Sequence, residues 1–229
     1  MTQISTNGMF QVILDWSEVW ALLIPLVAYH FHHRQPNYFK PVIVYLYGAL
    51  LLNLSSDFIG DFLSHLPDWL QSNLLLYAFH SLFRLLCFAS FFSQLKQPHL
   101  RLLRISLPWL YGLLAILNYI FLEDYLDQNH LSGNLFTLEA YILLIYCLLY
   151  YLSQLQTDVE SLRDDQEFWI VTGLSIYVVV NFFIFLFYVP MLRENSMLAE
   201  HMWGVHNVAY IILCLFITKA IYVPVRPAY

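Results

Sequence analysis

Residues 39–63 read FKPVIVYLYGALLLNLSSDFIGDFL, a stretch that is apolar for most of its length. A helix needs ~20 such residues to cross the ~30 Å hydrocarbon core of a membrane, so this stretch is long enough to span it. Six more stretches of comparable length fill nearly all of the 229-residue chain. The fold class expected is therefore all-α: a polytopic membrane protein that forms one seven-helix transmembrane bundle over residues 1–229. The seven predicted spans are 9–30, 39–63, 70–95, 103–121, 131–152, 168–189 and 202–222.

Composition favours a membrane protein and excludes several other classes. Apolar residues make up 60% of the chain and charged residues 11%, against about 25% charged in a soluble domain. The ten Lys and Arg residues are dispersed singly, so no basic stripe could bind the phosphates of a nucleic acid. Cys87, Cys147 and Cys214 each lie within an apolar stretch, and an odd number of cysteines inside helices does not form a disulfide framework. No Lys or Arg precedes the first apolar run, so a cleaved signal peptide is not expected either.

The positions of Lys and Arg predict how the bundle is oriented. Basic residues in short loops collect on the cytoplasmic side, whereas Asp and Glu contribute little. Eight basic residues fall on one side of the predicted membrane and only Arg193 falls on the other, while Arg84 lies within the third span. We therefore expect a multi-pass protein of the bacterial inner (plasma) membrane, with its N-terminus outside and its C-terminus in the cytoplasm. The eight basic residues are Arg34, Lys40, Lys96, Arg101, Arg104, Arg163, Lys219 and Arg226.

Polar and small side chains line one face of the second span. They follow one another at intervals of three, one, three, one and three residues, which places them on a single helical face. Ionisable groups are costly in hydrocarbon unless they are paired or hydrated, so this face is expected to look into the bundle. The residues of the face are Asn53, Ser56, Asp57, Gly60, Asp61 and Ser64.

The third span contains Arg84, the one basic residue within a predicted membrane core, one turn beyond His80. At ~1.5 Å per residue, Asp57 and His80 lie at a similar depth, and Arg84 lies about one turn deeper. An unpaired guanidinium is hard to tolerate at this depth. We therefore predict that Arg84 pairs with Asp57 or Asp61.

Further polar residues fall in the same outer half of the membrane. Glu139 lies about two turns into the fifth span, Asn181 lies in the sixth, and His206 and Asn207 lie near the start of the seventh. Together with the second and third spans, they predict an outward-facing cavity for a ligand. The alternative is that they form hydrogen bonds between helices and only stabilise the bundle. The predicted cavity residues are Asp57, Asp61, His80, Arg84, Glu139, Asn181, His206 and Asn207.

No cofactor is expected, although a divalent metal ion is an open alternative. Asp57 and Asp61 are four residues apart on one predicted helix, and carboxylates with imidazoles are ligands that Zn²⁺ accepts. His80 and His206 could complete such a set. Nothing in the spacing requires a metal, because His201 and His206 are five residues apart and point to different faces of an ideal helix.

The sixth and seventh spans carry a pattern of aromatic and polar residues. Its members are Glu167, Phe168, Trp169, Gly173, Tyr177, Asn181, Phe185, Trp203, His206 and Asn207. This pattern resembles the end of the seven-helix membrane regions of bacterial sensor proteins, some of which continue into a histidine kinase. The resemblance implies an input module of a signalling system. Because the sequence ends before any kinase, the output is expected to come from a separate chain.

Two histidines, His201 and His206, lie near the start of the seventh span. This arrangement is similar to that of the seven-helix intramembrane hydrolases related to alkaline ceramidases and adiponectin receptors, which hold a zinc ion through His residues. In that family the two histidines of the seventh helix are four residues apart, and the second helix carries a Ser ahead of a His. Here the second span offers Asp57 and Asp61 instead. A metal-dependent intramembrane hydrolase is therefore kept as an alternative function.

Together, these features predict an integral membrane receptor or sensor with an outward-facing polar cavity, and enzymatic activity stays open through the hydrolase alternative. A transporter of small solutes or ions is the second alternative. A ligand that entered from outside would change the pairing of Arg84, and the change would be passed to the segment 154–167. That segment is rich in acids, and besides the lipid bilayer it is the expected contact for a cytoplasmic signalling partner.

Overall fold

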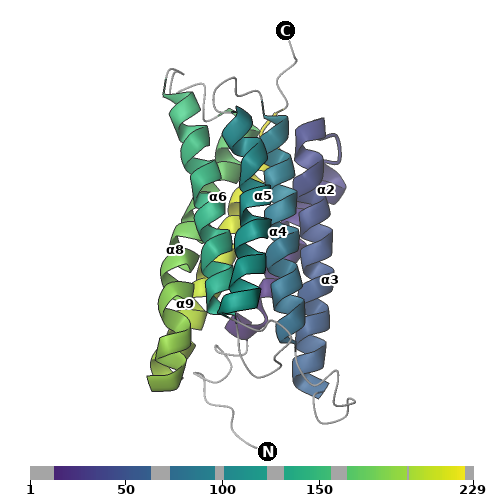
Figure 1. Ribbon diagram of the computed structural model, residues 1–229. Helices are drawn as coiled ribbons and strands as arrows, with labels where there is room; N and C mark the ends of the chain where they lie inside the picture. Colours follow the sequence, from purple (N-terminus) through teal and green to yellow (C-terminus); the bar gives the residue numbers. More distant parts are fainter. Residues whose placement is uncertain are drawn as a thin grey trace, which may run out of the picture.

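The computed structural model describes residues 13–62, 73–95, 101–122, 132–155, 164–194 and 196–224, and every regular element among them is a helix. The long helices run side by side as one bundle (Figure 1). The elements are α2 (Ser17–Phe31), the short 3-10 helix η1 (Asn37–Phe39), α3 (Lys40–Phe62), α4 (Leu74–Gln94), α5 (Arg101–Phe121), α6 (Gly133–Gln154), α8 (Gln166–Glu194) and α9 (Ser196–Tyr222).

Six helices in these ranges, α3 to α9, are long and apolar enough to cross a membrane. The predicted all-α membrane fold is confirmed at this level. The predicted first span, 9–30, corresponds to α2, which has 15 residues and is about 22 Å long, shorter than a hydrocarbon core. Residues 13–15 are also helical, while residues 9–12 lie outside the described ranges.

The predicted limits of the spans agree with the helices to within about two to four residues at most ends. The main difference is at α9, which begins at Ser196 rather than at residue 202. The prediction ended each span where apolar residues end, whereas a helix continues into the polar region at the membrane surface, because its backbone hydrogen bonds do not depend on hydrocarbon.

The helices form a closed ring. Each packs against the next along the chain, from α2 through α3, α4, α5, α6 and α8 to α9, and α9 packs back against α2. In addition, α4 packs against α6 across the ring. Side chains from α2, α4, α6, α8 and α9 can therefore meet near the axis of the bundle.

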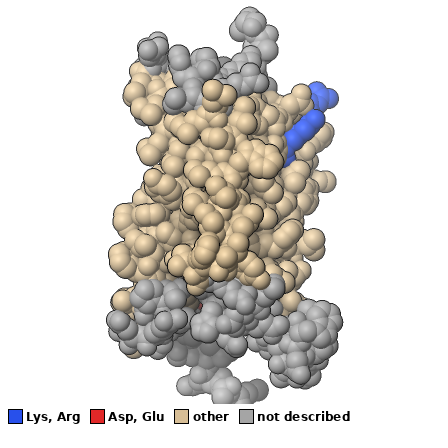
Figure 2. All heavy atoms as spheres, in the orientation of Figure 1, with Lys and Arg blue, Asp and Glu red and all other residues tan. Residues whose placement is uncertain are grey.

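The outside of the bundle is apolar and its inside is rich in aromatic rings. Figure 2 shows a face, in the orientation of Figure 1, on which almost all the coloured side chains are uncharged, with basic atoms near one end only. Exposed Leu, Ile and Phe side chains occur along all the long helices, as expected of helices that face lipid. Among the largest fully buried side chains are Tyr45, Tyr111, Tyr146, Tyr150, Tyr177 and Tyr210. Buried tyrosines need hydrogen-bond partners, so polar bonding is to be expected in the core.

Candidate functional site

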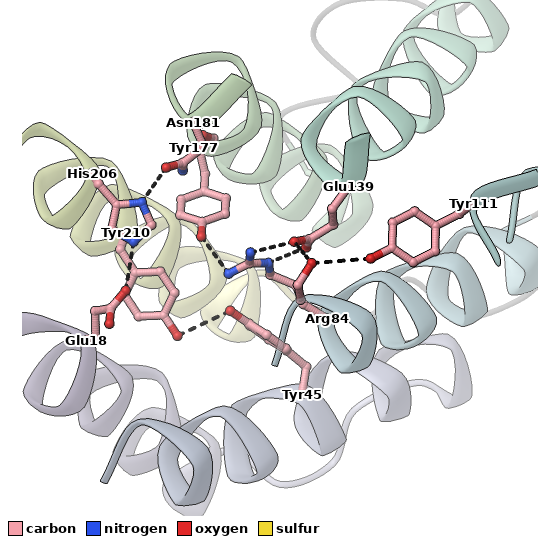
Figure 3. Close-up of polar contacts among 10 residues, drawn as sticks. Glu18, Tyr45, Arg84, Tyr111, Glu139, Tyr177, Asn181, His206 and Tyr210 are labelled. Carbon is pink, nitrogen blue, oxygen red and sulfur yellow. Dashed lines mark hydrogen bonds and ion pairs between the residues drawn. The ribbon is translucent and has the colours of Figure 1, made fainter. Parts of the chain in front are cut away.

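A buried ion pair joins α4 and α6 at the centre of the bundle. Arg84 donates from Nε to Oε1 of Glu139 at 2.6 Å and from Nη2 to Oε2 at 2.8 Å, the two parallel bonds of a bidentate pair (Figure 3). Arg84 is 8% exposed and Glu139 is 1% exposed. Removing either partner would leave the other charge buried without compensation.

Hydrogen bonds extend this ion pair to two more helices. The Nη1 atom of Arg84 donates to the hydroxyl of Tyr177 on α8 at 2.6 Å, and the guanidinium carbon lies 5.1 Å from the centre of the Tyr177 ring. Ser81 donates to Oε2 of Glu139 at 2.5 Å, and its Oγ lies 3.4 Å from the hydroxyl of Tyr111 on α5. One charged pair thus connects α4, α5, α6 and α8.

A second polar cluster joins α2, α8 and α9 around His206. Asn181 donates from its amide nitrogen to the backbone oxygen of Tyr177 at 2.7 Å, so its carbonyl oxygen is the atom that faces Nδ1 of His206. The other ring nitrogen, Nε2, lies 2.7 Å from Oε1 of Glu18 on α2. Asn53 on α3 donates to the backbone oxygen of Glu18 at 2.9 Å and holds this residue from the other side.

This geometry determines where the protons of His206 lie. Because Asn181 presents a carbonyl oxygen, Nδ1 must be the donor in that bond. A short contact between Nε2 and a carboxylate oxygen then requires a second proton, shared between His206 and Glu18. The two side chains therefore form either an imidazolium with a carboxylate or a neutral imidazole with a carboxylic acid.

A small cavity lies between the two clusters. The space available to the centre of a water molecule is about 20 Å³, enough for one water and too little for an organic solute. His80, which is 6% exposed, lines this cavity, and its Nε2 atom has no hydrogen-bond partner among the described residues. A buried imidazole nitrogen of this kind is usually satisfied by water. The lining residues are Glu18, Tyr77, His80, Ser81, Arg84, Phe136, Phe185, Trp203 and His206.

The structure brings together some of the predicted cavity residues and not others. His80, Arg84 and His206 line the cavity, while Glu139 and Asn181 bond to Arg84 and His206 from behind. Asn207 instead donates to the backbone oxygen of Leu14 at 3.0 Å. Asp57 is not one of the lining residues, and the side chain of Asp61 lies outside what the structure describes.

The predicted partner of Arg84 is wrong. Its carboxylate is Glu139 on α6 rather than Asp57 on α3, and the side chain of Asp61 lies outside what the structure describes. Spacing along a helix gives the depth of a side chain, but depth alone does not determine which neighbouring helix the side chain faces. Because α4 also packs against α6 across the ring, Arg84 reaches the centre of the bundle rather than α3.

Sequence reasoning placed Glu18 and Tyr177 outside the predicted cavity, yet both are central to the site. Glu18 had a usable signal, since an acid within an apolar stretch is a functional candidate. Tyr177 belongs to the aromatic and polar pattern of the sixth span, but as one of 17 tyrosines in the chain it did not stand out as a partner for Arg84.

The metal set considered from the sequence is not assembled around the cavity. His80 and His206 line it, whereas Asp57 does not. Within residues 13–62, 73–95, 101–122, 132–155, 164–194 and 196–224, no three His, Cys, Asp or Glu side chains are grouped so that they could hold a metal ion.

Comparisons with protein-family models, with curated proteins and with solved structures find no match to this chain. The function therefore has to be argued from the geometry of the site. Two features of that geometry are informative: the bidentate Arg84–Glu139 pair, and the 2.7 Å contact between Glu18 and His206.

Proposed function

We propose that this protein is a receptor or sensor of the bacterial inner membrane whose input is the proton held between Glu18 and His206. In this proposal α2 crosses the bilayer with the six longer helices, the N-terminus is outside and the C-terminus is in the cytoplasm. The output is a displacement of α2 relative to α9, which a separate partner reads through the segment 154–167. Most of that segment, residues 156–163, lies outside the described ranges.

The observation that carries the proposal is the contact of 2.7 Å between Nε2 of His206 and Oε1 of Glu18. If the shared proton is lost, a nitrogen lone pair and a carboxylate oxygen face each other at hydrogen-bond distance. Two acceptors repel at that distance, and neither is solvated well in a buried site. Loss of one proton would therefore push α2 away from α9, and its return would draw them together.

The charged groups around Glu18 and His206 favour this pair as the place where a proton is gained or lost. From α4, Arg84 and His80 line the same cavity, and from α6 Glu139 neutralises Arg84 through the bidentate bonds. From α8, Tyr177 already accepts a bond from Arg84. Since Arg84 and Glu139 form a neutral unit held by two hydrogen bonds, the proposal assigns the change of charge to Glu18 and His206.

A route to the opposite end of the bundle is present in the hydrogen bonds of Gln166, the first residue of α8. Its amide nitrogen lies 3.0 Å from the backbone oxygen of Val223 and 2.8 Å from Oε1 of Gln35, and it donates to both. Gln35 in turn donates to the backbone oxygens of His32 and Ile221. The ends of α2 and α9 are thus tied to Gln166, which lies within the segment 154–167, so a displacement of either helix would be felt in that segment.

The size of the cavity favours sensing over transport of a solute. Room for a single water molecule suits a proton but not an organic ligand. Arg84 and Glu139 can remain buried with so little water nearby, because their bonds to each other and to Ser81 and Tyr177 replace those that water would supply.

The proposal is tested by measuring the distance between α2 and α6 by electron spin resonance in lipid nanodiscs. Spin labels are attached at Leu23→Cys and Leu148→Cys, two exposed positions on helices that are not neighbours in the ring. We expect the mean distance to change by about 2 Å, the size of a typical helix shift, when the pH is changed between about 5 and about 8. The native Cys87, Cys147 and Cys214 are buried, so the unsubstituted chain gives the background of labelling.

The matched control is Glu18→Gln in the same labelled chain. Its amide N–H can donate to Nε2 of a neutral His206, so the contact no longer needs the extra proton. We expect the distance to become independent of pH. A distance that is unchanged by pH in the starting chain would reject the proposal, and so would a protein-dependent collapse of a pH gradient across liposomes, which would indicate a transporter instead.

A further inference from the structure

An apolar groove of about 530 Å³ opens on the outside of the bundle between α4 and α5, with α6 at its back. The walls are formed by Ala78, Phe79 and Leu82 of α4 and by Gly112 and Ala115 of α5. The groove lies within two helices that are long and apolar enough to cross a membrane. Its contents are therefore drawn from the hydrocarbon region and not from water.

Hydrogen bonds tie α5 to its neighbours near its two ends, and Tyr111 lies 3.4 Å from Ser81 of α4 on the inner side of the groove. Near one end, Arg104 donates to the backbone oxygen of Phe92 at 2.9 Å, and Tyr146 donates to the backbone oxygen of Arg104 at 2.6 Å. Near the other end, Asn134 donates to the side-chain oxygen of Asn118 at 3.3 Å. Between these two ties, small residues face each other across α4 and α5.

Gly112 shows that the space is open. A Cβ atom built on Gly112 would meet nothing within 4 Å. By contrast, a Cβ on Gly48 or Gly173 would collide with the side chain of Phe83 or Phe216, so those glycines permit close packing of helices. Gly112 has no such neighbour among the described residues, and glycine weakens a helix interior by roughly 0.5–1 kcal/mol relative to alanine. The room that it leaves is used only if something else enters the groove.

Size and chemistry identify the occupant. A helix with its side chains is about 10 Å wide. A single acyl chain is thinner, is flexible and matches the apolar walls, and a cavity of this size within hydrocarbon is not left empty or filled with water. We propose that the groove binds one acyl chain of a membrane phospholipid.

The inner side of the groove connects the site to the core of the bundle. Tyr111 lines the groove, and its hydroxyl lies 3.4 Å from Oγ of Ser81, which donates to Glu139. A bound chain would therefore press on the residue next to the buried ion pair. The site itself does not depend on the proton input proposed above.

The test uses the whole protein in bilayers of phosphatidylcholine that carries a photoreactive diazirine on one acyl chain, followed by mass spectrometry of the labelled peptides. We expect labelling to concentrate on the facing residues of α4 and α5, and Gly112→Leu to reduce it several-fold by filling the groove. Leu113→Phe, at an exposed position one residue further along α5, is the matched control and should leave labelling unchanged. Ala78→Leu fills the groove from the other wall, and it replaces Gly112→Leu in the test if that variant does not fold.

Three results would overturn this proposal. Labelling spread evenly around α5 would mean ordinary contact with bulk lipid. Labelling that both filling variants leave unchanged would mean that the chain binds elsewhere. If Gly112→Leu instead converted a dimer into a monomer in mass photometry without altering lipid labelling, a second copy of the protein would be the occupant. None of these results would change the pH response of the spin-label distance, so the two proposals fail separately.

Discussion

Arg84 and Glu139 are two charges that lie among apolar side chains, where little water can screen them. Each satisfies the other: the guanidinium donates twice to Glu139 and once to Tyr177, and the carboxylate also accepts from Ser81. Such a pair adds little net stability compared with apolar residues of the same volume, but either charge buried without its partner is strongly destabilising. Its place in the fold therefore depends on both members being present.

We predict that Glu139→Gln destabilises the bundle by about 3–5 kcal/mol, because it leaves the charge of Arg84 buried without a counter-charge. The double variant Arg84→Met, Glu139→Leu should recover most of the loss. Thermal unfolding in detergent checks both statements. Arg34→Met, at an exposed position, is the control and should change little. A double variant less stable than Glu139→Gln would show that the pair is net stabilising.

The sequence was sufficient to single out Arg84, because an Arg inside an apolar stretch is rare and must be paired. It was not sufficient to find the partner. Spacing along one helix gives the depth and the face of a side chain, whereas the helix that this face meets depends on packing around the ring. The contact between α4 and α6, which places Glu139 next to Arg84, joins helices that are not consecutive in the chain.

At the scale of the element, helix contacts depend on where glycine lies. On α8, a Cβ at Gly173 would collide with the Cβ of Phe216 on α9, an atom attached to the backbone that cannot rotate away. Adding the methyl group therefore requires α8 and α9 to separate. The ring of Trp169, which is tilted against the Phe216 ring with its centre 5.8 Å away, would have to shift as well.

We predict that Gly173→Ala destabilises the protein by about 1–3 kcal/mol, the cost of overpacking a well-packed interface. Gly112→Ala is the matched substitution on α5, where the methyl group has room, and should stabilise the protein by roughly 0.5–1 kcal/mol through helix propensity. Unfolding of the two variants under the same conditions measures the difference. Equal effects of the two substitutions would contradict the packing of α8 against α9.

Helix limits were largely predictable from the sequence, for a physical reason. The hydrocarbon core demands a minimum apolar length, so the ends of α3 and α5 agree closely with the predicted spans 39–63 and 103–121. The groove beside α5 was not predictable in this way. It arises from the absence of side-chain volume at Gly112 and from the spacing of α4 and α5, and neither leaves a periodic signal.

For the molecule as a whole, consecutive long helices of the bundle run in opposite directions (Figure 1), so each crossing of the membrane would take the chain to the other side. A chain that crosses the membrane at α2 and at each later helix has its two ends on different sides, and the sorted basic residues favour the cytoplasm for the C-terminal end. Arg34 is exposed in the connection between α2 and α3, and Lys40 is exposed at the start of α3. Lys219 lies over the ring of Trp169 near the end of α9, at the same end of the bundle.

The orientation can be tested with two leucines that are matched in exposure and lie at opposite ends of the bundle: Leu122 after α5, 73% exposed, and Leu155 after α6, 78% exposed. In intact bacterial cells, a membrane-impermeant maleimide should label Leu122→Cys, while Leu155→Cys should react only after permeabilisation. The unsubstituted chain, whose three cysteines are buried, sets the background. The opposite pattern would invert the bundle and place the Glu18–His206 pair in the cytoplasmic half, so that the proton sensed would come from inside the cell.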